Sequence, residues 1–368
     1  MLAACAVPLI AADKGIHSKG IHSASAKDKG PAVVTGAAPA GDVVLGVAAQ
    51  ARHLLIDEGY STAVVANCGS ITPELEFKWD MVEPERGDWN LLGAKQIVRF
   101  VQQHAMQMHG HALVWHKSMP PWAVEDMLKH KDWRIVRRYI ATLVEQCGPT
   151  VAGWDVVNEP LLPGARADGL RPSPLLQAFG PDYIERAFDD AAAHAGGAVL
   201  YLNEYGLLWS FAESEAKRTA ALRLLEQLVK GGAPIGGLGI QGHLEIAKMP
   251  FFDQSIVARF LQEVEAMGLR FRISELDVKE DRTDLAVEER DRLVAEAAGA
   301  LLDVAVESRS LTGVTCWGLS DRYSWLAPQS ASAGLNRGLP LDSDLRQKSM
   351  FDVVQNALLR ADALAARS

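Results

Sequence analysis

The chain has 368 residues, of which 48% are hydrophobic, and this length fits one large barrel domain with a tail or two medium domains. Its formal net charge of −9 gives no support for nucleic-acid binding, which usually requires a basic face. No apolar run in the sequence reaches the roughly 18 residues that a membrane-spanning helix needs.

The first 41 residues differ in composition from the remainder of the chain. Residues 1–12 resemble the apolar core of a secretory signal, although no positive segment precedes them, and the residues up to Cys5 resemble a bacterial lipoprotein cleavage box. Residues 13–41 are rich in Ala, Ser, Lys, Gly and Pro, which is typical of a flexible linker. We therefore expect an exported protein, secreted or periplasmic, with its catalytic domain over residues 42–368; a disordered apolar tail is the alternative for the start.

From residue 42 onward, short apolar runs alternate with longer amphipathic segments. Strands are predicted near residues 43–46, 69–72, 107–115, 152–158, 199–203, 238–243, 270–276 and 313–318. Helices are predicted between them, including residues 91–104, 132–146, 182–195, 213–230, 254–267 and 287–307, with Asp132 and Asp253 as N-caps. This alternation predicts an α/β fold, either a single (β/α)8 TIM barrel or a doubly wound open sheet.

The positions of the polar residues favour the barrel. Residues capable of chemistry stand at the C-terminal ends of six or seven different predicted strands. A barrel gathers these strand ends around one mouth, whereas an open sheet spreads them along an edge. We therefore expect one barrel domain with its site at that mouth.

Two of the predicted strands end in a glutamate. Glu159 follows the run W-D-V-V-N at residues 154–158, and Glu275 follows Ile273 and Ser274. A structural salt bridge is the simpler explanation for either residue alone, because glutamate is rarely buried without a partner. A pair of carboxylates at one mouth can hydrolyse a glycosidic bond, since one protonates the leaving oxygen and the other attacks the sugar carbon.

The neighbours of the two glutamates support a shared site. Adjacent strand residues point to opposite faces, so Asn158 and Glu159 share a site only where the strand opens into a loop, which Pro160 favours. Glu275 and Asp277 leave their strand on one face, where two like charges would raise one pKa. His243 is expected to bridge them and to keep Glu275 ionised; an ordinary barrel histidine is the alternative.

A metal site is a second interpretation of the third predicted strand. His109, His111 and Trp115 fall on one face, and an H-x-H pair on a barrel strand also holds zinc in some hydrolases. His243 and Asp277 could complete such a site, but it would leave the paired glutamates unexplained. We therefore predict no metal and no cofactor. The cysteines show no C-x-x-C pattern, and three are expected to be free buried thiols: Cys68, Cys147 and Cys316.

Two further groups follow predicted strands. Glu74 and Lys78 either form a helical i,i+4 ion pair or hydrogen-bond sugar hydroxyls. Trp317 and Trp325 either wall a sugar-binding pocket or belong to the core.

Together, the segments W-D-V-V-N-E-P, G-I-Q-G-H and E-L-D occur in an order that resembles family 10 of the glycoside hydrolases, the β-1,4-xylanase family, from about residue 42 to residue 359. The resemblance implies a retaining endo-β-1,4-glycanase acting on xylan, with Glu159 as acid/base and Glu275 as nucleophile. It implies catalytic support from Asn158, Gln241, His243 and Asp277. It implies contacts to a polysaccharide or oligosaccharide from Glu74, Lys78, His111, Trp115, Asn203, Tyr205, Trp317 and Trp325. We expect a monomer.

The chain departs from this family pattern at the second sugar on the nonreducing side. Leu75 stands where the family usually has Asn, and Ser118 stands where it usually has Gln. Each lost hydrogen bond costs roughly 0.5–1.5 kcal/mol, so the site either binds xylan about one to two orders of magnitude more weakly or serves another β-glycan, such as a bacterial exopolysaccharide. A non-hydrolytic sugar-binding barrel is a remote alternative, because both glutamates are present.

Overall fold

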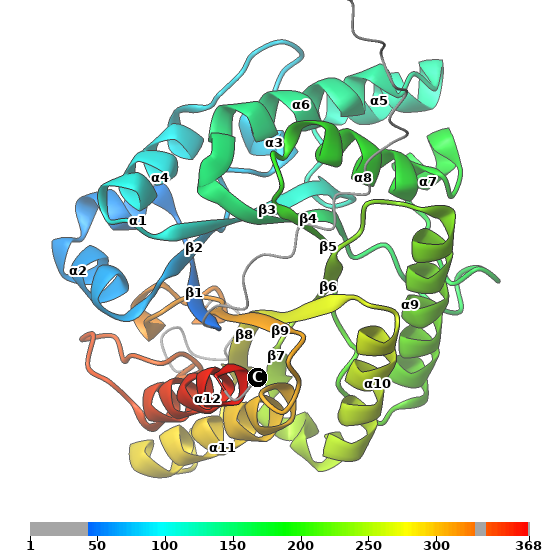
Figure 1. The fold of residues 1–368 in the computed structure, drawn as a ribbon. Coiled ribbons are helices and arrows are strands. Elements are labelled where there is room, and N and C mark those ends of the chain that lie inside the picture. The colour runs from blue at the N-terminus through cyan, green and yellow to red at the C-terminus, as the bar shows by residue number, and fades with distance from the viewer. Residues whose placement is uncertain (1–42, 328–335, 367–368) are drawn as a thin grey trace, which may run out of the picture. The chain divides into compact units, whose positions relative to one another are not determined.

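The computed structural model describes residues 43–327 and 336–366 (Figure 1). The expected export signal, the linker and Cys5 all lie outside these ranges. Among the described helices, none is both long enough and apolar enough to cross a membrane.

Eight parallel strands form a closed barrel in the described part of the chain. Their order is β1, β2, β3, β4, β5, β6, β8 and β9, and β9 pairs again with β1. A short strand, β7, follows β6 and pairs with the far end of β8. The bounds are β1 (Val44–Ala49), β2 (Ser70–Pro73), β3 (Gln107–Trp115), β4 (Val151–Asn158), β5 (Val199–Glu204), β6 (Gly237–Ile240), β7 (His243–Glu245), β8 (Arg270–Lys279) and β9 (Leu311–Cys316). The closed ladder confirms the predicted barrel, because in an open sheet the two edge strands would each lack a partner on one side.

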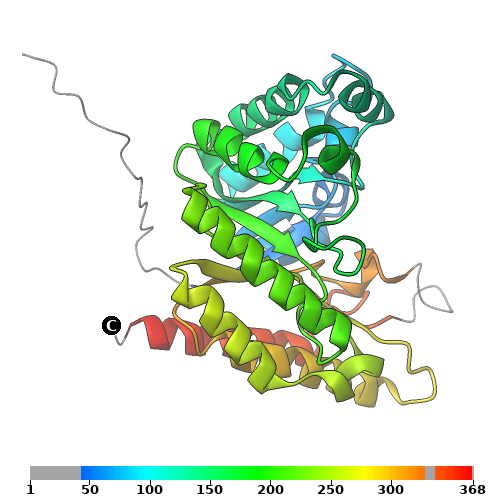
Figure 2. The ribbon, with the colours of Figure 1, turned by 90° about the vertical axis from the view of Figure 1, so that its right-hand side faces the viewer.

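The helices surround the barrel, as Figures 1 and 2 show from two sides. The α-helices are α1 (Ala51–Ile56), α2 (Glu58–Asn67), α3 (Trp79–Val82), α4 (Leu92–Gln103), α5 (Pro121–His130), α6 (Arg134–Cys147), α7 (Pro174–Phe179), α8 (Tyr183–His194), α9 (Ala212–Gly231), α10 (Gln254–Ala266), α11 (Val287–Ala305) and α12 (Ser349–Ala365). The 3-10 turns are η1 (Gly148–Thr150), η2 (Ile246–Phe251) and η3 (Asp321–Tyr323). The predicted helices are present with ends within two residues of those expected.

The α10 helix illustrates how local sequence sets these elements. Asp253 caps it by accepting hydrogen bonds from the amides of Ser255 (2.8 Å) and Ile256 (3.3 Å), as predicted. Its buried residues recur at spacings of three and four and face the barrel: Val257, Phe260, Leu261 and Val264. The prediction for Asp132 is wrong by one residue, because Trp133 occupies the N-cap position of α6.

The strands that carry the two glutamates are buried on both faces, since helices cover one face and the barrel interior fills the other. Trp154 of β4 packs across β3 at Gly110, where any added Cβ would lie 2.1 Å from the indole ring. The three expected free thiols are confirmed: Cys68, Cys147 and Cys316 are buried and unpaired within the described ranges.

Candidate active site

The chain leaves strand β4 at Glu159. This residue has a φ of 56°, a left-handed conformation that is uncommon outside glycine. The turn interrupts the alternation of the strand, so that Asn158 and Glu159 can serve the same end of the barrel. The opening predicted from Pro160 is therefore present in the structure.

Glu275 lies inside β8 and accepts hydrogen bonds from two neighbouring elements. Its Oε2 is 3.0 Å from His243 Nε2, and its Oε1 accepts from Asn203 Nδ2 at 2.7 Å. Burial by itself would raise the pKa of Glu275, but the hydrogen bonds and positive charge around it lower that pKa below its usual value. Glu275 is therefore held as an oriented carboxylate.

His243 forms the bridge that the sequence predicted. Its Nδ1 lies 2.8 Å from Asp277 Oδ1, and the second oxygen of Asp277 accepts from the Trp325 indole N–H. Burial would lower the pKa of His243, but Asp277 and Glu275 outweigh it and raise the pKa to about 10. His243 is therefore an imidazolium at neutral pH, and both of its ring nitrogens donate.

Side-chain amides connect Glu275 to the end of β4. Asn158 Oδ1 accepts from Asn203 Nδ2 (2.9 Å) and from Gln241 Nε2 (3.2 Å), and Ser274 donates to Asn203 Oδ1 (2.6 Å). Gln241 thus contacts Asn158, although the resemblance implied contact with Glu275. Asn203, implied to contact sugar, has no exposed surface and lies between Asn158 and Glu275.

The charges of both glutamates act on the half-buried side chain of Lys78. Burial lowers the pKa of Lys78, while the negative charges of Glu275, Glu74 and Asp80 and, least of these, Glu159 act to raise it. Its Nζ lies 4.8 Å from the centre of the Trp115 ring. Residues 74–78 form a loop, so the helical ion pair with Glu74 does not form. Burial raises the pKa of Glu74.

The main chain around Glu159 is held by Arg171. The Arg171 side chain donates to the carbonyls of Glu159 (2.8 Å) and Leu161 (3.1 Å) and to the Tyr205 hydroxyl (2.8 Å). Lys117 Nζ lies 3.2 Å from Glu159 Oε2, and this oxygen has no hydrogen-bond partner among the described residues. Sequence reasoning missed both cations as site residues, because no pattern around either one points to Glu159.

Tyr205 supports the same loop from β5. Lys217 Nζ lies 3.3 Å from the centre of the Tyr205 ring and 2.7 Å from Glu204 Oε1. Glu204 also accepts from the Leu161 amide at 3.0 Å, and burial raises its pKa to about 7 against the influence of Lys217. Tyr205 therefore contacts Arg171 and Lys217, and Arg171 in turn holds the main chain at Glu159.

The histidine pair on β3 is hydrogen-bonded to a carboxylate. His109 Nε2 and His111 Nδ1 each lie 2.9 Å from a different oxygen of Asp155 on β4. Over the part of the chain that the structure describes, no group of three or more His, Cys, Asp or Glu residues could hold a metal ion. The arrangement of His109 and His111 is thus that of an internal hydrogen-bonded network.

The two tryptophans after β9 differ in exposure. Trp317 is 8% exposed and packs edge-on against His111, with ring centres 5.1 Å apart. Trp325 is 39% exposed, and its ring lies 5.3 Å from that of His243. Trp325 therefore offers a ring face to a ligand, while Trp317 mainly packs against the site histidines.

Comparison with known proteins agrees with this site. Residues 34–357 match the profile of glycosyl hydrolase family 10, and the chain belongs to this family of glycoside hydrolases. It is 31% identical to endo-1,4-beta-xylanase A of Caldicellulosiruptor saccharolyticus, covering 76% of this chain and 83% of that protein. It is also 31% identical to the beta-1,4-xylanase of Dictyoglomus thermophilum, covering 76% and 79%.

Solved structures show the same barrel. Xylanase 10B of Thermotoga petrophila RKU-1, in complex with xylobiose, superposes with a TM-score of 0.77 at 25% identity, covering 87% of this chain and 94% of that chain. An endo-1,4-beta-xylanase of Caldicellulosiruptor owensensis gives 0.75 at 27% identity, covering 86% and 97%.

Proposed function

We propose that this enzyme is a retaining endo-1,4-β-xylanase in which Glu275 is the nucleophile and Glu159 the general acid/base. The observation that carries the proposal is the state of Glu275, a buried carboxylate kept ionised by the His243 imidazolium and the Asn203 amide. The xylanase names of the relatives support xylan as the substrate.

In the first step, a Glu275 oxygen attacks the anomeric carbon of the sugar. The bond from that carbon to the glycosidic oxygen breaks, and Glu159 donates its proton to the departing oxygen. The products are a covalent glycosyl-enzyme ester and a shortened chain with a free hydroxyl. Asn158, held by Asn203 and Gln241, contacts the 2-hydroxyl of the reacting sugar.

In the second step, the ionised Glu159 takes a proton from water, and the resulting hydroxide attacks the anomeric carbon. The ester bond to Glu275 breaks, which restores the nucleophile and retains the configuration. Lys117, 3.2 Å from Glu159 Oε2, stabilises the ionised acid between the two steps.

Proton NMR of xylo-oligosaccharide hydrolysis tests this mechanism. The β-anomer should appear first and mutarotate later. Initial release of the α-anomer would overturn retention, and absence of hydrolysis of xylan and xylo-oligosaccharides would overturn the substrate assignment.

A second candidate function keeps the mechanism and changes the glycan. Leu75 is a half-buried apolar residue in the loop after β2, and Ser118 is a buried, short side chain after β3. A panel of soluble β-glycans beside xylan tests it, and faster turnover of another glycan would favour this candidate. If xylan is the substrate, the double variant L75N/S118Q should lower KM for xylotriose about tenfold by restoring two hydrogen bonds.

We also propose that the enzyme is exported, because residues 1–12 are apolar and its proposed substrate is a polymer. N-terminal sequencing of protein recovered from outside the cytoplasm tests this. Recovery of the protein only from the cytoplasm would contradict it.

A further inference from the structure

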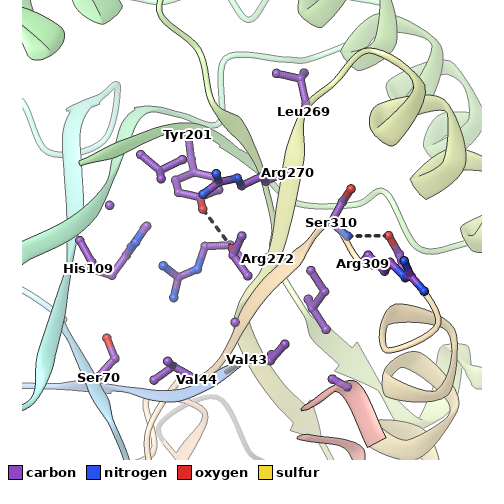
Figure 3. Close-up of a pocket in the computed structure, with 18 of the residues that line it drawn as sticks. Val43, Val44, Ser70, His109, Tyr201, Leu269, Arg270, Arg272, Arg309 and Ser310 are labelled. Carbon is purple, nitrogen blue, oxygen red and sulfur yellow. Dashed lines mark hydrogen bonds between the residues drawn. The ribbon is translucent and has the colours of Figure 1, made fainter. Parts of the chain in front are cut away.

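The end of the barrel opposite the two glutamates contains a cavity of about 730 Å³ (Figure 3). Residues at the N-terminal starts of β1, β2, β3, β4, β5, β8 and β9 line it, together with the end of α12. Small-molecule sites usually have volumes of about 300–1,000 Å³. Bulky branched side chains usually fill the interior of such a barrel, so a cavity of this size calls for an explanation.

A buried cation faces this cavity. Arg272 of β8 is 8% exposed and lines the cavity wall. Figure 3 shows its side chain extending across the cavity toward the side that carries His109 and Ser70. The guanidinium donates to Thr315 Oγ1, but its Nε–H is buried and has no hydrogen-bond partner among the described residues. The negative charge of Asp155 acts favourably on this guanidinium. Its buried Nε–H still lacks a hydrogen-bond acceptor among the described residues, and an acceptor placed in the cavity would remove that cost.

The remaining polar groups make the cavity suitable for an anion. The pKa of His109 is lowered to about 4 by burial and then by Arg272, so this imidazole is neutral. Tyr201 OH lies 3.0 Å from Thr312 Oγ1, which fixes a second polar group on the wall. Two more arginines, Arg270 and Arg309, line the cavity with one acid, Glu265, whose Oε2 accepts from Ser308.

Another part of the wall is apolar, beside polar residues that include Ser70, Gln107 and Ser310. Val44, Leu269, Leu311 and Leu364 come from two strands, the turn before β8 and helix α12. An inorganic anion would leave this surface facing water, whereas an organic anion would cover it.

We propose that this cavity is a binding site for a small organic carboxylate, which pairs with Arg272 and places a short apolar body against Leu269, Leu311 and Leu364. The planar guanidinium suits a carboxylate because its N–H groups form a fork that matches the two oxygens. Ligand binding would also stabilise the barrel, since the ligand would supply a hydrogen-bond acceptor for the Nε–H of Arg272.

Calorimetry and thermal unfolding of the full chain test the site at constant ionic strength. Sodium butyrate is the probe, and 1-butanol is its uncharged counterpart. Butyrate should bind and raise Tm, and butanol should do neither. Arg272→Gln should weaken butyrate binding by about tenfold or more, because it removes the fork. Arg292→Gln is the matched control: it removes an exposed arginine of α11 that does not line the cavity and should change the Kd less than about threefold.

A second variant keeps the test decisive if Arg272→Gln does not fold. Leu364→Trp should fill the cavity from α12, leaving Arg272 intact, and should abolish butyrate binding while xylan hydrolysis is retained. The proposal is overturned if the parent chain does not bind butyrate, if binding survives in both variants, or if butanol or inorganic phosphate acts as well as butyrate.

Discussion

The two glutamates of the active site are almost equally buried, with 6% of Glu159 and 5% of Glu275 exposed, yet their surroundings differ. Glu275 lies within a strand, and each of its oxygens is hydrogen-bonded by a side chain of another strand. Glu159 lies beyond the end of a strand, and its Oε2 has an ammonium nearby but no hydrogen bond from the described residues. Burial alone therefore does not set the chemistry of a carboxyl group.

The difference matches the two proposed roles. A nucleophile must stay ionised and aligned, and fixed donors on Glu275 provide both. An acid/base must gain and lose a proton in every cycle, which fixed donors on its oxygens would hinder. Arg171 positions Glu159 through its main-chain carbonyl and does not hydrogen-bond the carboxyl group.

The largest effect should come from removing either carboxyl group. Glu275→Ala and Glu159→Ala should each reduce kcat/KM on xylan by about 10⁴-fold or more. The two variants should differ in the rate of the first step on an aryl xylobioside with a dinitrophenolate leaving group. That group departs without a proton, so Glu159→Ala should retain a rapid first step, which a burst of phenolate measures.

Added azide sharpens this distinction. It should accelerate turnover of the aryl substrate by Glu159→Ala and give a β-glycosyl azide, because azide needs no general base. Asp284→Asn, at an exposed carboxylate, is the control and should keep parental activity. Equal bursts from the two alanine variants would contradict the assigned roles.

A smaller effect should follow from replacing His243. His243→Gln should lower kcat/KM by about 10²–10³-fold and move its acidic limb to higher pH, because loss of the imidazolium raises the pKa of Glu275. A pH–rate profile measures this shift. Trp325→Phe removes the indole hydrogen bond to Asp277 but keeps His243, so it should shift the limb less. An unmoved limb in His243→Gln would show that another group keeps Glu275 ionised.

The charge on His243 should also appear in stability. Its pKa is about 10 when folded and about 6.5 when unfolded, so its contribution is complete below pH 6.5 and is lost as the pH rises through 10. The gap in unfolding free energy between the parent and His243→Gln should therefore be largest near about pH 6 and shrink toward about pH 10 by a few kcal/mol. Denaturant titrations at several pH values measure it. Phe260→Leu, an uncharged core change, should give a gap that does not vary with pH.

The smallest effect should come from replacing the side chains that hold the main chain of Glu159 in place. Arg171→Lys cannot hold the carbonyls of Glu159 and Leu161 and the Tyr205 hydroxyl together, so kcat should fall about tenfold with little change in KM. Tyr205→Phe loses one of these bonds and should cost about threefold. Steady-state kinetics on xylotetraose measure both. A change in KM alone would indicate that Arg171 contacts the substrate instead of positioning Glu159.

Local sequence was sufficient to predict the elements and the bridge between Glu275 and Asp277. Apolar runs and 3.6-residue periodicity are properties of neighbouring residues, so they located all eight barrel strands and helices such as α10. The spacing of Glu275 and Asp277 put both on one face of β8, and His243 was the side chain able to bridge them, as the structure shows.

Contacts between distant segments were decided only by the tertiary structure. Asn203 reaches both Asn158 and Glu275 because barrel closure sets the register of β5 beside β4, and no local pattern encodes that register. Arg171 holds Glu159 only because the loop after β4 folds back on itself. The Nε of Arg272 lacks an acceptor among the described residues because barrel closure buries it where no such residue offers one. Whether a hydrogen bond forms depends on differences of a few tenths of an ångström in the donor–acceptor distance. These distances are set by the packing of the whole barrel.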